Sequence, residues 1–298
     1  MEQQKPKMQR FTFKDFDKMF ADDAACLEWL RNFLYPNGIF CSKCNSITKH
    51  HRVISRPSYS CDQCGHHVHP MADTIFHKSC TSLRTWFHAI YLMASTRCGI
   101  SAKQIERETG VTYKTAWRMF NKIRSLLDED RILSGNVEAD EAYFGGAHDG
   151  GGKRHGRGTH KAAVFGIVER KGKVIAKVVP DVTAKTLVGT IHEKVLPMST
   201  VYTDEYPSYN TVPGERQYHH KRIHHATKIW VVGDIHTNTI EGFWSLLRRG
   251  IGGVYHSVSH KYLQTYLDEY SFRYSHRHDI DPMFLTFLRQ IEKAESVD

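Results

Sequence analysis

Two pairs of cysteines constrain the fold of this chain more than any other feature of its sequence. Cys41 and Cys44 form one C-x2-C motif, and Cys61 and Cys64 form a second after a gap of 16 residues. Each motif presents two sulfurs on one side of a tight turn, and four thiolates satisfy the tetrahedral coordination that Zn²⁺ prefers. The total of seven cysteines, an odd number, argues against a disulfide framework. Because a closed four-cysteine site leaves no open coordination position, the sequence predicts a zinc ribbon with one structural metal ion.

The rest of the composition is that of a basic globular protein. The 298 residues are 40% hydrophobic and carry a formal net charge of +9, with 20 histidines besides. A basic surface favours polyanions because it neutralises phosphates and releases counterions, but charge alone leaves a plain solvated surface as an equal alternative. No apolar run approaches the roughly 20 residues needed to span a membrane, and the polar N-terminus has no signal-peptide pattern. We therefore expect a cytoplasmic protein.

Composition divides the chain into three regions. Residues 1–80 contain an N-terminal helix, with Cys26 on its apolar face as a core residue, and the zinc ribbon. Residues 81–130 read as helical, and residues 136–298 alternate strand-like and helix-like segments. Within the last region, residues 145–161 contain seven glycines and four Lys or Arg residues, which predicts a mobile basic loop. The side chains of this loop expected to contact polyanion backbones are Lys153, Arg154 and Arg157.

The second region carries the pattern of a helix-turn-helix motif. Ser101 is placed to cap a short helix, Gly110 to end it, and Thr112 to cap a second helix. Many DNA-binding proteins insert the start of such a second helix into the major groove, but a plain helical hairpin has the same signature. The neighbouring zinc ribbon and the positive charge favour DNA binding. The residues expected to meet the groove are Thr112, Tyr113, Lys114, Thr115 and Arg118.

Acidic residues accompany the strand-like segments of the third region. Residues 136–146 read as a short strand that ends in two glycines and bears the carboxylates of Glu138, Asp140 and Glu141. Carboxylates among apolar neighbours are unfavourable unless they hold a metal or a partner. A hairpin, a helix and a fourth strand are expected next, over residues 162–169, 174–179, 185–195 and 200–203. The fourth strand ends at Asp204, and α/β proteins place functional groups at such strand ends.

Another carboxylate lies on a helix predicted over residues 238–249. The apolar face of this helix consists of Ile240, Phe243, Trp244 and Leu247. Glu241 lies on a neighbouring stripe, and Arg248 follows it two turns later on the same side. In-line transfer of a phosphodiester requires two hard cations about 3.5–4 Å apart, and Mg²⁺ prefers carboxylate ligands. Two strand aspartates and a helix glutamate supply such ligands, and Arg248 is placed to hold a nearby phosphate.

These motifs resemble those of insertion-sequence transposases that join an N-terminal zinc ribbon to an RNase H-like DDE catalytic domain. The resemblance rests on the two cysteine pairs and on residues 137–146, 202–209, 236–245 and 261–273. Together these stretches cover most of residues 25–278. The resemblance implies an α/β protein in which a zinc ribbon and a helix-turn-helix-like segment precede an RNase H-like domain, a mixed sheet flanked by helices.

The same resemblance implies the chemistry. The expected catalytic and metal-binding acids are Asp140, Asp204 and Glu241. They would hold two Mg²⁺ or Mn²⁺ ions, besides the Zn²⁺ of the ribbon. The implied function is DNA transposition, in which the protein binds the terminal inverted repeats of double-stranded DNA as a homodimer or larger assembly. It would cleave the 3′ ends by hydrolysis and join them to target DNA by transesterification.

Alternatives remain for individual ligands. Some relatives use asparagine as the third ligand, and Asn238 lies one helical turn before Glu241. Glu138 and Glu141 are rival carboxylates beside Asp140. On a strand, Glu138 shares the face of Asp140, whereas the side chain of Glu141 points to the opposite face.

Two other functions are compatible with the sequence. One is a domesticated regulator that binds DNA through its zinc ribbon and has lost catalysis, and the other is an RNase H-like nuclease without end recognition. Residues 216–228 include four histidines, two arginines and two lysines, and they fit either a DNA contact or a solvated rim. A transposase is expected in the cytoplasm, and on the nucleoid when it is bound to DNA.

Overall fold

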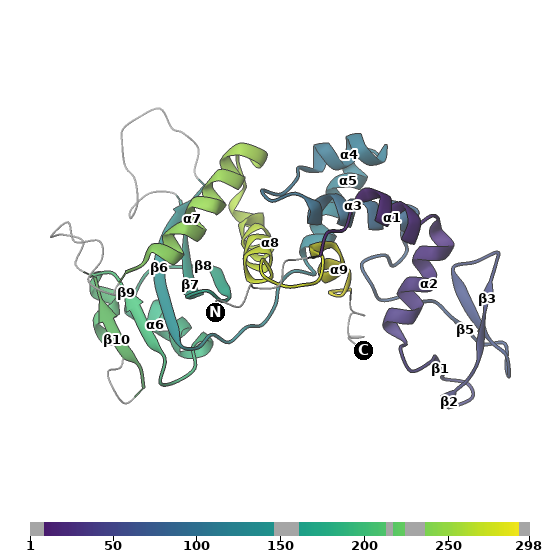
Figure 1. Ribbon diagram of the computed structural model, residues 1–298, viewed down its shortest axis with the longest axis horizontal. Coiled ribbons are helices and arrows are strands. Elements are labelled where there is room, and N and C mark those ends of the chain that lie inside the picture. Colours follow the sequence, from purple (N-terminus) through teal and green to yellow (C-terminus); the bar gives the residue numbers. More distant parts are fainter. Residues whose placement is uncertain (1–8, 146–160, 213–216, 224–235, 292–298) are drawn as a thin grey trace, which may run out of the picture. The chain divides into compact units, whose positions relative to one another are not determined.

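The computed structural model describes residues 9–145, 161–212, 217–223 and 236–291 (Figure 1). The chain forms two compact units, one from residues 1–126 and 279–298 and the other from residues 127–278. Within the described ranges, no helix is both long enough and apolar enough to cross a membrane. Three basic residues of the predicted loop lie outside the described residues: Lys153, Arg154 and Arg157.

Most helices of the first unit begin at a side chain that caps them. Each of these side chains accepts a hydrogen bond from the amide three residues later, and they are Thr12, Asp22, Ser82, Ser101 and Thr112. The helices that follow them are α1 (Phe13–Met19), α2 (Asp23–Leu34), α3 (Leu83–Ser95), α4 (Ala102–Thr109) and α5 (Tyr113–Arg124). Cys26 is buried in α2, which confirms its prediction as a core residue, and burial raises the pKa of its thiol to about 12. Gly110 ends α4 with a φ of 72°, so α4 and α5 form the predicted helix, glycine turn and helix.

Aromatic rings form the core of the first unit. Phe16 in the middle of α1 and Phe20 directly after it both pack against Phe284 of α9, with ring centroids 5.7 and 5.8 Å apart. Phe20 also packs against Phe87 of α3 at 5.0 Å. The last helix, α9, spans Met283–Leu288. The sequence placed all residues after 136 in one region, whereas the structure groups the residues from 279 onward with the first unit. Packing of Phe284 accounts for this difference, because a contact between residues so distant in sequence leaves no local pattern.

The ribbon consists of short antiparallel strands. β1 (Phe40–Cys41) pairs with β2 (Ser46–Ile47). β4 (Ser58–Cys61) pairs with β3 (His50–Val53) on one side and with β5 (His67–Val68) on the other. The first cysteine of each pair ends a strand, β1 or β4, and the second follows in the turn after it.

A mixed sheet of five strands forms the centre of the second unit. In spatial order its strands are β10 (His219–Arg222), β9 (Thr200–Thr203), β6 (Asn136–Phe144), β7 (Ala162–Glu169) and β8 (Val174–Val179). β7 is antiparallel to both of its neighbours, β6 and β8, whereas β9 is parallel to β6 and β10 is parallel to β9. Four of these strands match the predicted segments. β10 was not predicted, because its sequence of histidines and basic residues has no apolar alternation.

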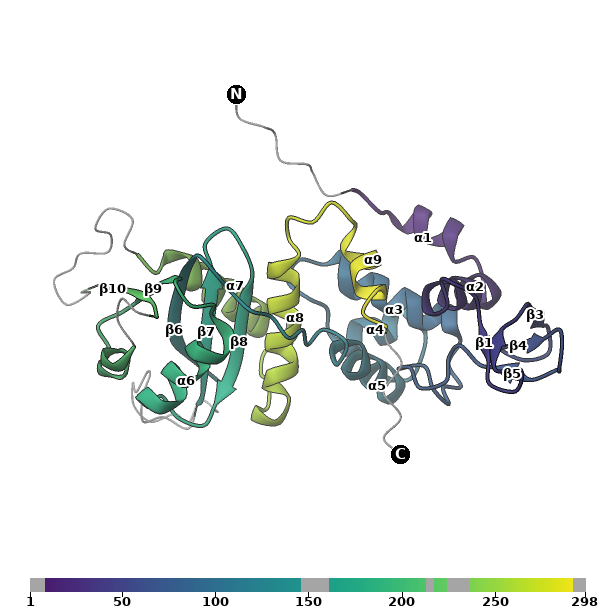
Figure 2. The ribbon, with the colours of Figure 1, turned by 90° about the horizontal axis from the view of Figure 1, so that it is seen from below.

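Helices cover both faces of this sheet (Figures 1 and 2). They are α6 (Ala184–Lys194), α7 (Asn238–Gly250) and α8 (Leu263–Ser275). Shorter turns lie at η1 (Pro207–Thr211), η3 (Ile251–Tyr255) and η4 (His260–Tyr262). Leu187 of α6 packs with Val137 on one face, and Trp244 of α7 and Leu267 of α8 pack with Val164 on the other. The predicted α/β fold class, with a zinc ribbon and a mixed sheet flanked by helices, is confirmed.

Candidate active site and metal centre

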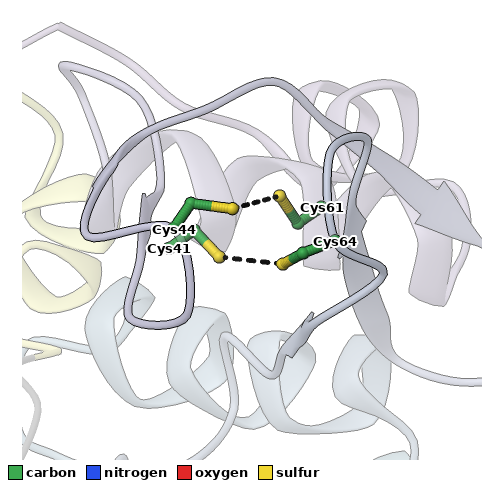
Figure 3. Close-up of side chains that lie close together, drawn as sticks. All are labelled: Cys41, Cys44, Cys61 and Cys64. Carbon is green, nitrogen blue, oxygen red and sulfur yellow. Dashed lines mark hydrogen bonds between the residues drawn. The ribbon is translucent and has the colours of Figure 1, made fainter.

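The four cysteines of the ribbon converge on one point (Figure 3). The Sγ atoms of Cys41 and Cys64 are 3.5 Å apart, and those of Cys44 and Cys61 are 3.8 Å apart. A tetrahedron with Zn–S bonds of about 2.3 Å separates its sulfurs by about 3.8 Å, so this cluster fits one structural Zn²⁺. Among the described residues, it is the one group of at least three potential ligand atoms gathered within 4.8 Å of one another. The prediction of a structural zinc site is therefore supported by geometry.

The histidines near the ribbon are engaged elsewhere. His66 Nε2 lies 3.2 Å from the hydroxyl of Ser42, and His67 Nδ1 lies 3.1 Å from that of Ser58. The hydroxyl of Thr48 lies 3.1 Å from Sγ of Cys61, where it can donate a hydrogen bond to a thiolate. Thr48 is therefore placed to stabilise the thiolate of Cys61 by a hydrogen bond, and the four cysteines remain the metal ligands.

β6 divides its carboxylates between two faces of the sheet. Glu138 and Asp140 point toward α7, where they accept hydrogen bonds from that helix. Glu141 points to the opposite face and accepts a 2.9 Å hydrogen bond from the phenol of Tyr209 in η1. The alternation predicted from the sequence is confirmed by these contacts.

Asp140 is a partly buried carboxylate in an unfavourable environment. Burial raises its pKa to about 7, and the negative charges of Glu141 and Asp204 act in the same direction. A 3.0 Å hydrogen bond from the indole Nε1 of Trp244 to Oδ2 of Asp140 opposes the increase in pKa. The indole reaches this position across Gly166, the residue of β7 that pairs with Asp140. A Cβ atom at Gly166 would lie 2.4 Å from Cζ2 of Trp244, so only glycine leaves room for the ring.

Asp204 lies at the same level of the sheet as Asp140. In the parallel pair of β6 and β9, Glu138 lies opposite Tyr202. Asp140 follows two residues later in β6, Asp204 comes directly after the end of β9, and the charge of Asp204 acts on Asp140. Oδ1 of Asp204 accepts a 2.9 Å hydrogen bond from the amide of Tyr206, which fixes the carboxylate after the strand end. The structure thus brings two of the three predicted acids together.

Glu241 lies on α7, exposed and one turn before Trp244. Its Oε1 accepts a 3.0 Å hydrogen bond from the hydroxyl of Thr237. Asn238, the alternative ligand, is also exposed at the start of the helix. The three acids are not gathered as tightly as the cysteines, although the helix that carries Glu241 also contacts Asp140.

Two residues of this region were missed by sequence reasoning. Trp244 was predicted only as part of an apolar helix face, and its indole donor to Asp140 gave no local signal. Tyr209 is completely buried, and burial and the neighbouring carboxylates Glu141 and Asp140 raise its pKa well above its ordinary value. A buried phenol that donates to a carboxylate orients that carboxylate.

The candidate DNA-contacting residues lie at the start of α5. Tyr113 is 49% exposed, and Lys114 and Arg118 are also exposed. Thr112 and Thr115 take part in the helix cap instead, with the amide of Thr115 donating to the hydroxyl of Thr112. In the second unit, Arg248 is exposed near the end of α7, with its guanidinium carbon 5.7 Å from the ring centroid of Phe144.

Comparisons with known proteins agree with this architecture. Residues 132–275 match the model of the ISXO2-like transposase domain, and residues 21–67 match the model of the transposase zinc-ribbon domain. A protein of Halobacterium salinarum described as an uncharacterized protein in transposable element ISH50 is 29% identical over 278 residues, with 86% of this chain and 92% of that protein covered. An uncharacterized transposase-like protein of Haemophilus influenzae is 33% identical over 127 residues, with 43% of this chain and 99% of that protein covered.

A solved structure also overlaps with part of the fold. It is a chain in the structure of the simian T-cell lymphotropic virus intasome in complex with PP2A regulatory subunit B56 gamma. The overlap covers 61% of this chain and 65% of that chain, with a TM-score of 0.30 and 14% sequence identity. Similarity at this level supports no statement about function.

Proposed function

This chain belongs to the ISXO2-like family of insertion-sequence transposases, and on this premise we propose that it is an active DNA transposase. Its substrates are the terminal inverted repeats of its element and a target duplex. Its reaction is hydrolysis at the 3′ ends, followed by transfer of the 3′-OH groups to target DNA. The acids that carry the reaction are Asp140, Asp204 and Glu241.

The observation that carries this proposal is the pair formed by Asp140 and Asp204. Adjacent parallel strands bring the two carboxylates to one level, and their mutual repulsion contributes to the raised pKa of Asp140. Like charges held together in a partly buried site are unfavourable unless a cation or a proton neutralises them. An arrangement of this kind is typical of a site that takes up a divalent cation.

The donor set fits Mg²⁺ or Mn²⁺. Carboxylate oxygens are hard ligands, and no thiol or imidazole interacts with Asp140 among the described contacts. Asp140, Asp204 and either Glu241 or Asn238 would hold two such ions. When bound, divalent cations supply Lewis-acid activation of the attacking oxygen and stabilisation of the leaving oxygen.

The residues of the chain contribute orientation and charge. Trp244 orients the carboxylate of Asp140 through the hydrogen bond from its indole to Oδ2. The amide of Tyr206 fixes one oxygen of Asp204 in the same way. The exposed guanidinium of Arg248, two turns after Glu241, is placed to bind a DNA phosphate.

We assign DNA recognition to the ribbon and to the helix-turn-helix pair of α4 and α5. The exposed Tyr113, Lys114 and Arg118 support this assignment, because they line the part of α5 that would enter a major groove. Thr112 and Thr115 help to form the cap that orients this surface. Synapsis of two ends requires a dimer or a larger assembly on DNA.

Strand transfer with short duplexes that carry the terminal repeats tests the proposal. The wild-type protein should process and join the ends with Mg²⁺ or Mn²⁺, and D140N and D204N should lose both steps while they retain binding of the ends. D181N, which changes an exposed aspartate before α6, is the matched control and should retain activity. Wild-type activity in D140N would refute the assignment of Asp140.

The other outcomes separate the alternative functions. A wild-type protein that binds the ends but cleaves with neither metal is the domesticated regulator. Cleavage of any duplex without preference for the terminal repeats indicates a simple nuclease. Separate tests of E241Q and N238A identify the third ligand, since only the variant of the true ligand should abolish joining.

A further inference from the structure

The first turn of α7 is attached to the sheet by a buried carboxylate, that of Glu138. We propose that Glu138 is a positioning residue, which fixes α7 and therefore Glu241 at the metal-binding edge of β6. This inference rests on the proposed function, because it assigns a purpose to the placement of the third acid. It gives Glu138 a role other than that of a metal ligand.

The start of α7 lacks a cap of its own. Thr237 occupies the capping position, but its side chain makes no capping hydrogen bond. Oε2 of Glu138 instead accepts hydrogen bonds from the amides of Thr239 at 2.8 Å and Ile240 at 3.0 Å. The amides at the start of a helix need acceptors, and here a residue about 100 positions earlier supplies one. The hydroxyl of Thr237 is thereby available for its 3.0 Å hydrogen bond to Oε1 of Glu241.

The negative charge of Glu138 is balanced within the protein. Its side chain is 0% exposed, and Nε of Arg170 donates a 2.8 Å hydrogen bond to Oε1. Arg170 also donates from Nη2 to the backbone oxygen of His236 at 2.8 Å, and its guanidinium carbon lies 3.9 Å from the ring centroid of Tyr202. A buried carboxylate is tolerated when it is paired and hydrogen-bonded, and the positive end of the α7 dipole adds to the pairing.

Both oxygens of Glu138 are fully used by these contacts. Oε1 accepts from Arg170 and from the hydroxyl of Thr239 at 2.9 Å, and Oε2 accepts from two amides. A carboxylate has about four lone-pair positions, so four donors leave none for a metal ion. Glu138 therefore cannot replace Asp140 as a ligand without the loss of its hold on α7.

The helix is held at two points on either side of Glu241. Glu138 and Asp140 lie two residues apart on one face of β6, about 7 Å along the strand. Glu138 binds the helix at residues 239–240, and Asp140 accepts from Trp244. A helix attached at both places cannot slide along the strand or rotate about its axis without breaking one attachment. Glu138 therefore determines where Glu241 lies along β6 relative to Asp140.

A second buried ion pair in the same unit provides a matched control. Glu269 of α8 is 0% exposed and accepts hydrogen bonds from Nε of Arg273 at 3.0 Å and from Nη2 at 2.6 Å. Like Glu138, it is a buried glutamate paired with an arginine, but its partner Arg273 lies one turn later on the same helix, α8. A general effect of removing a buried charge should therefore appear equally in E138Q and E269Q.

The inference is tested by measuring how tightly the zinc-loaded full chain binds Mn²⁺ in the absence of DNA. Electron paramagnetic resonance detects the free Mn²⁺ and so gives the affinity. E138Q should weaken Mn²⁺ binding about 10- to 100-fold, the range for residues that orient metal ligands. Hydrogen exchange at the amides of Thr239 and Ile240 should accelerate in the same variant. E269Q should bind Mn²⁺ as the wild type does. Binding by E138Q within about twofold of the wild type would overturn the inference.

Two further variants keep the test decisive. E138D retains the charge that pairs with Arg170, but its side chain is one methylene too short to reach the amides of α7. It should therefore weaken Mn²⁺ binding. This variant keeps the inference testable if E138Q does not fold. Wild-type binding in E138D would overturn the inference. D140N tests the proposed function separately, because unchanged Mn²⁺ binding in D140N contradicts the metal site itself. Loss in D140N with no loss in the Glu138 variants contradicts only the positioning role.

Discussion

Replacement of Asp140 by asparagine should stabilise the protein at neutral pH, although it removes the proposed activity. In the absence of divalent cations, the folded chain raises the pKa of Asp140 from 3.8 to about 7 through burial and the charges of Glu141 and Asp204. Asparagine is nearly isosteric, and its side-chain oxygen can still accept the hydrogen bond from Trp244. The substitution therefore removes the unfavourable charge and leaves the packing in place.

The sign and the magnitude follow from the two pKa values. Below about pH 3, Asp140 is protonated in the folded and the unfolded chain, so the charge makes no difference to the free energy of unfolding. As the pH rises toward 7, the unfolded chain releases this proton while the folded chain retains it, and the wild type loses stability relative to D140N. At 1.36 kcal/mol per pH unit, with the slope decreasing as the pH nears the folded pKa, the advantage of D140N should grow by about 2 kcal/mol between pH 5 and pH 7. Above the folded pKa of about 7 it should level off at about 4 kcal/mol, an upper limit because Asp140 is partly exposed.

The difference in the free energy of unfolding between D140N and the wild type is measured by urea denaturation. Tryptophan fluorescence monitors the unfolding, and no divalent ions are added. D181N is the control of opposite sign, because hydrogen bonds from Thr186 and Thr183 lower the pKa of Asp181. D181N should therefore be less stable than the wild type above the unfolded pKa of 3.8, by an amount that stays constant from pH 5 to pH 8. Added Mn²⁺ should stabilise the wild type and leave D140N unchanged. A difference between D140N and the wild type that stays constant from pH 5 to pH 8 would refute the argument.

Three further predictions concern packing, zinc and DNA. G166A places a Cβ 2.4 Å from the indole of Trp244, so it should lower the free energy of unfolding by about 1–3 kcal/mol in urea denaturation and reduce strand transfer. C64S should lose the stoichiometric zinc that atomic absorption measures. C80S changes an exposed cysteine outside the cluster and should retain the zinc, and zinc retained by C64S would contradict the assignment. K114A should weaken binding of the terminal repeats and reduce the slope of log K against log salt by about 1, and an unchanged slope would exclude a phosphate contact.

Local chemistry made much of the fold predictable. The cysteine pairs fix the ribbon because their spacing determines which sulfurs can share one metal ion. Ser101, Gly110 and Thr112 mark the ends of α4 and α5 because a helix cap is satisfied within three residues. Apolar runs on either side of the turn at residues 171–173 likewise indicated the hairpin of β7 and β8. These features depend on residues that are close together in the sequence, and a single chain contains all the information needed for them.

The features that were missed depend on contacts between distant residues. β10 is held by pairing with β9, not by an apolar pattern of its own. Phe284 reaches the core of the first unit from the far end of the chain. The α7 donors to Glu138 and Asp140 come from residues about 100 positions later, on a helix whose orientation no local pattern specifies.

The contrast between Glu138 and Asp140 shows what the structure adds to the sequence at the proposed site. Both are carboxylates on one face of one strand, two residues apart, and the sequence alone left them as rivals. Four donors, one of them a guanidinium, satisfy the carboxylate of Glu138, whereas burial and two negative neighbours raise the pKa of Asp140. A carboxylate whose charge is already balanced gains little from a cation, and one whose charge is opposed by its neighbours gains much. The same strand therefore supplies an acid suited to hold α7 in place and an acid suited to bind the metal, and their environments, not their spacing, decide which is which.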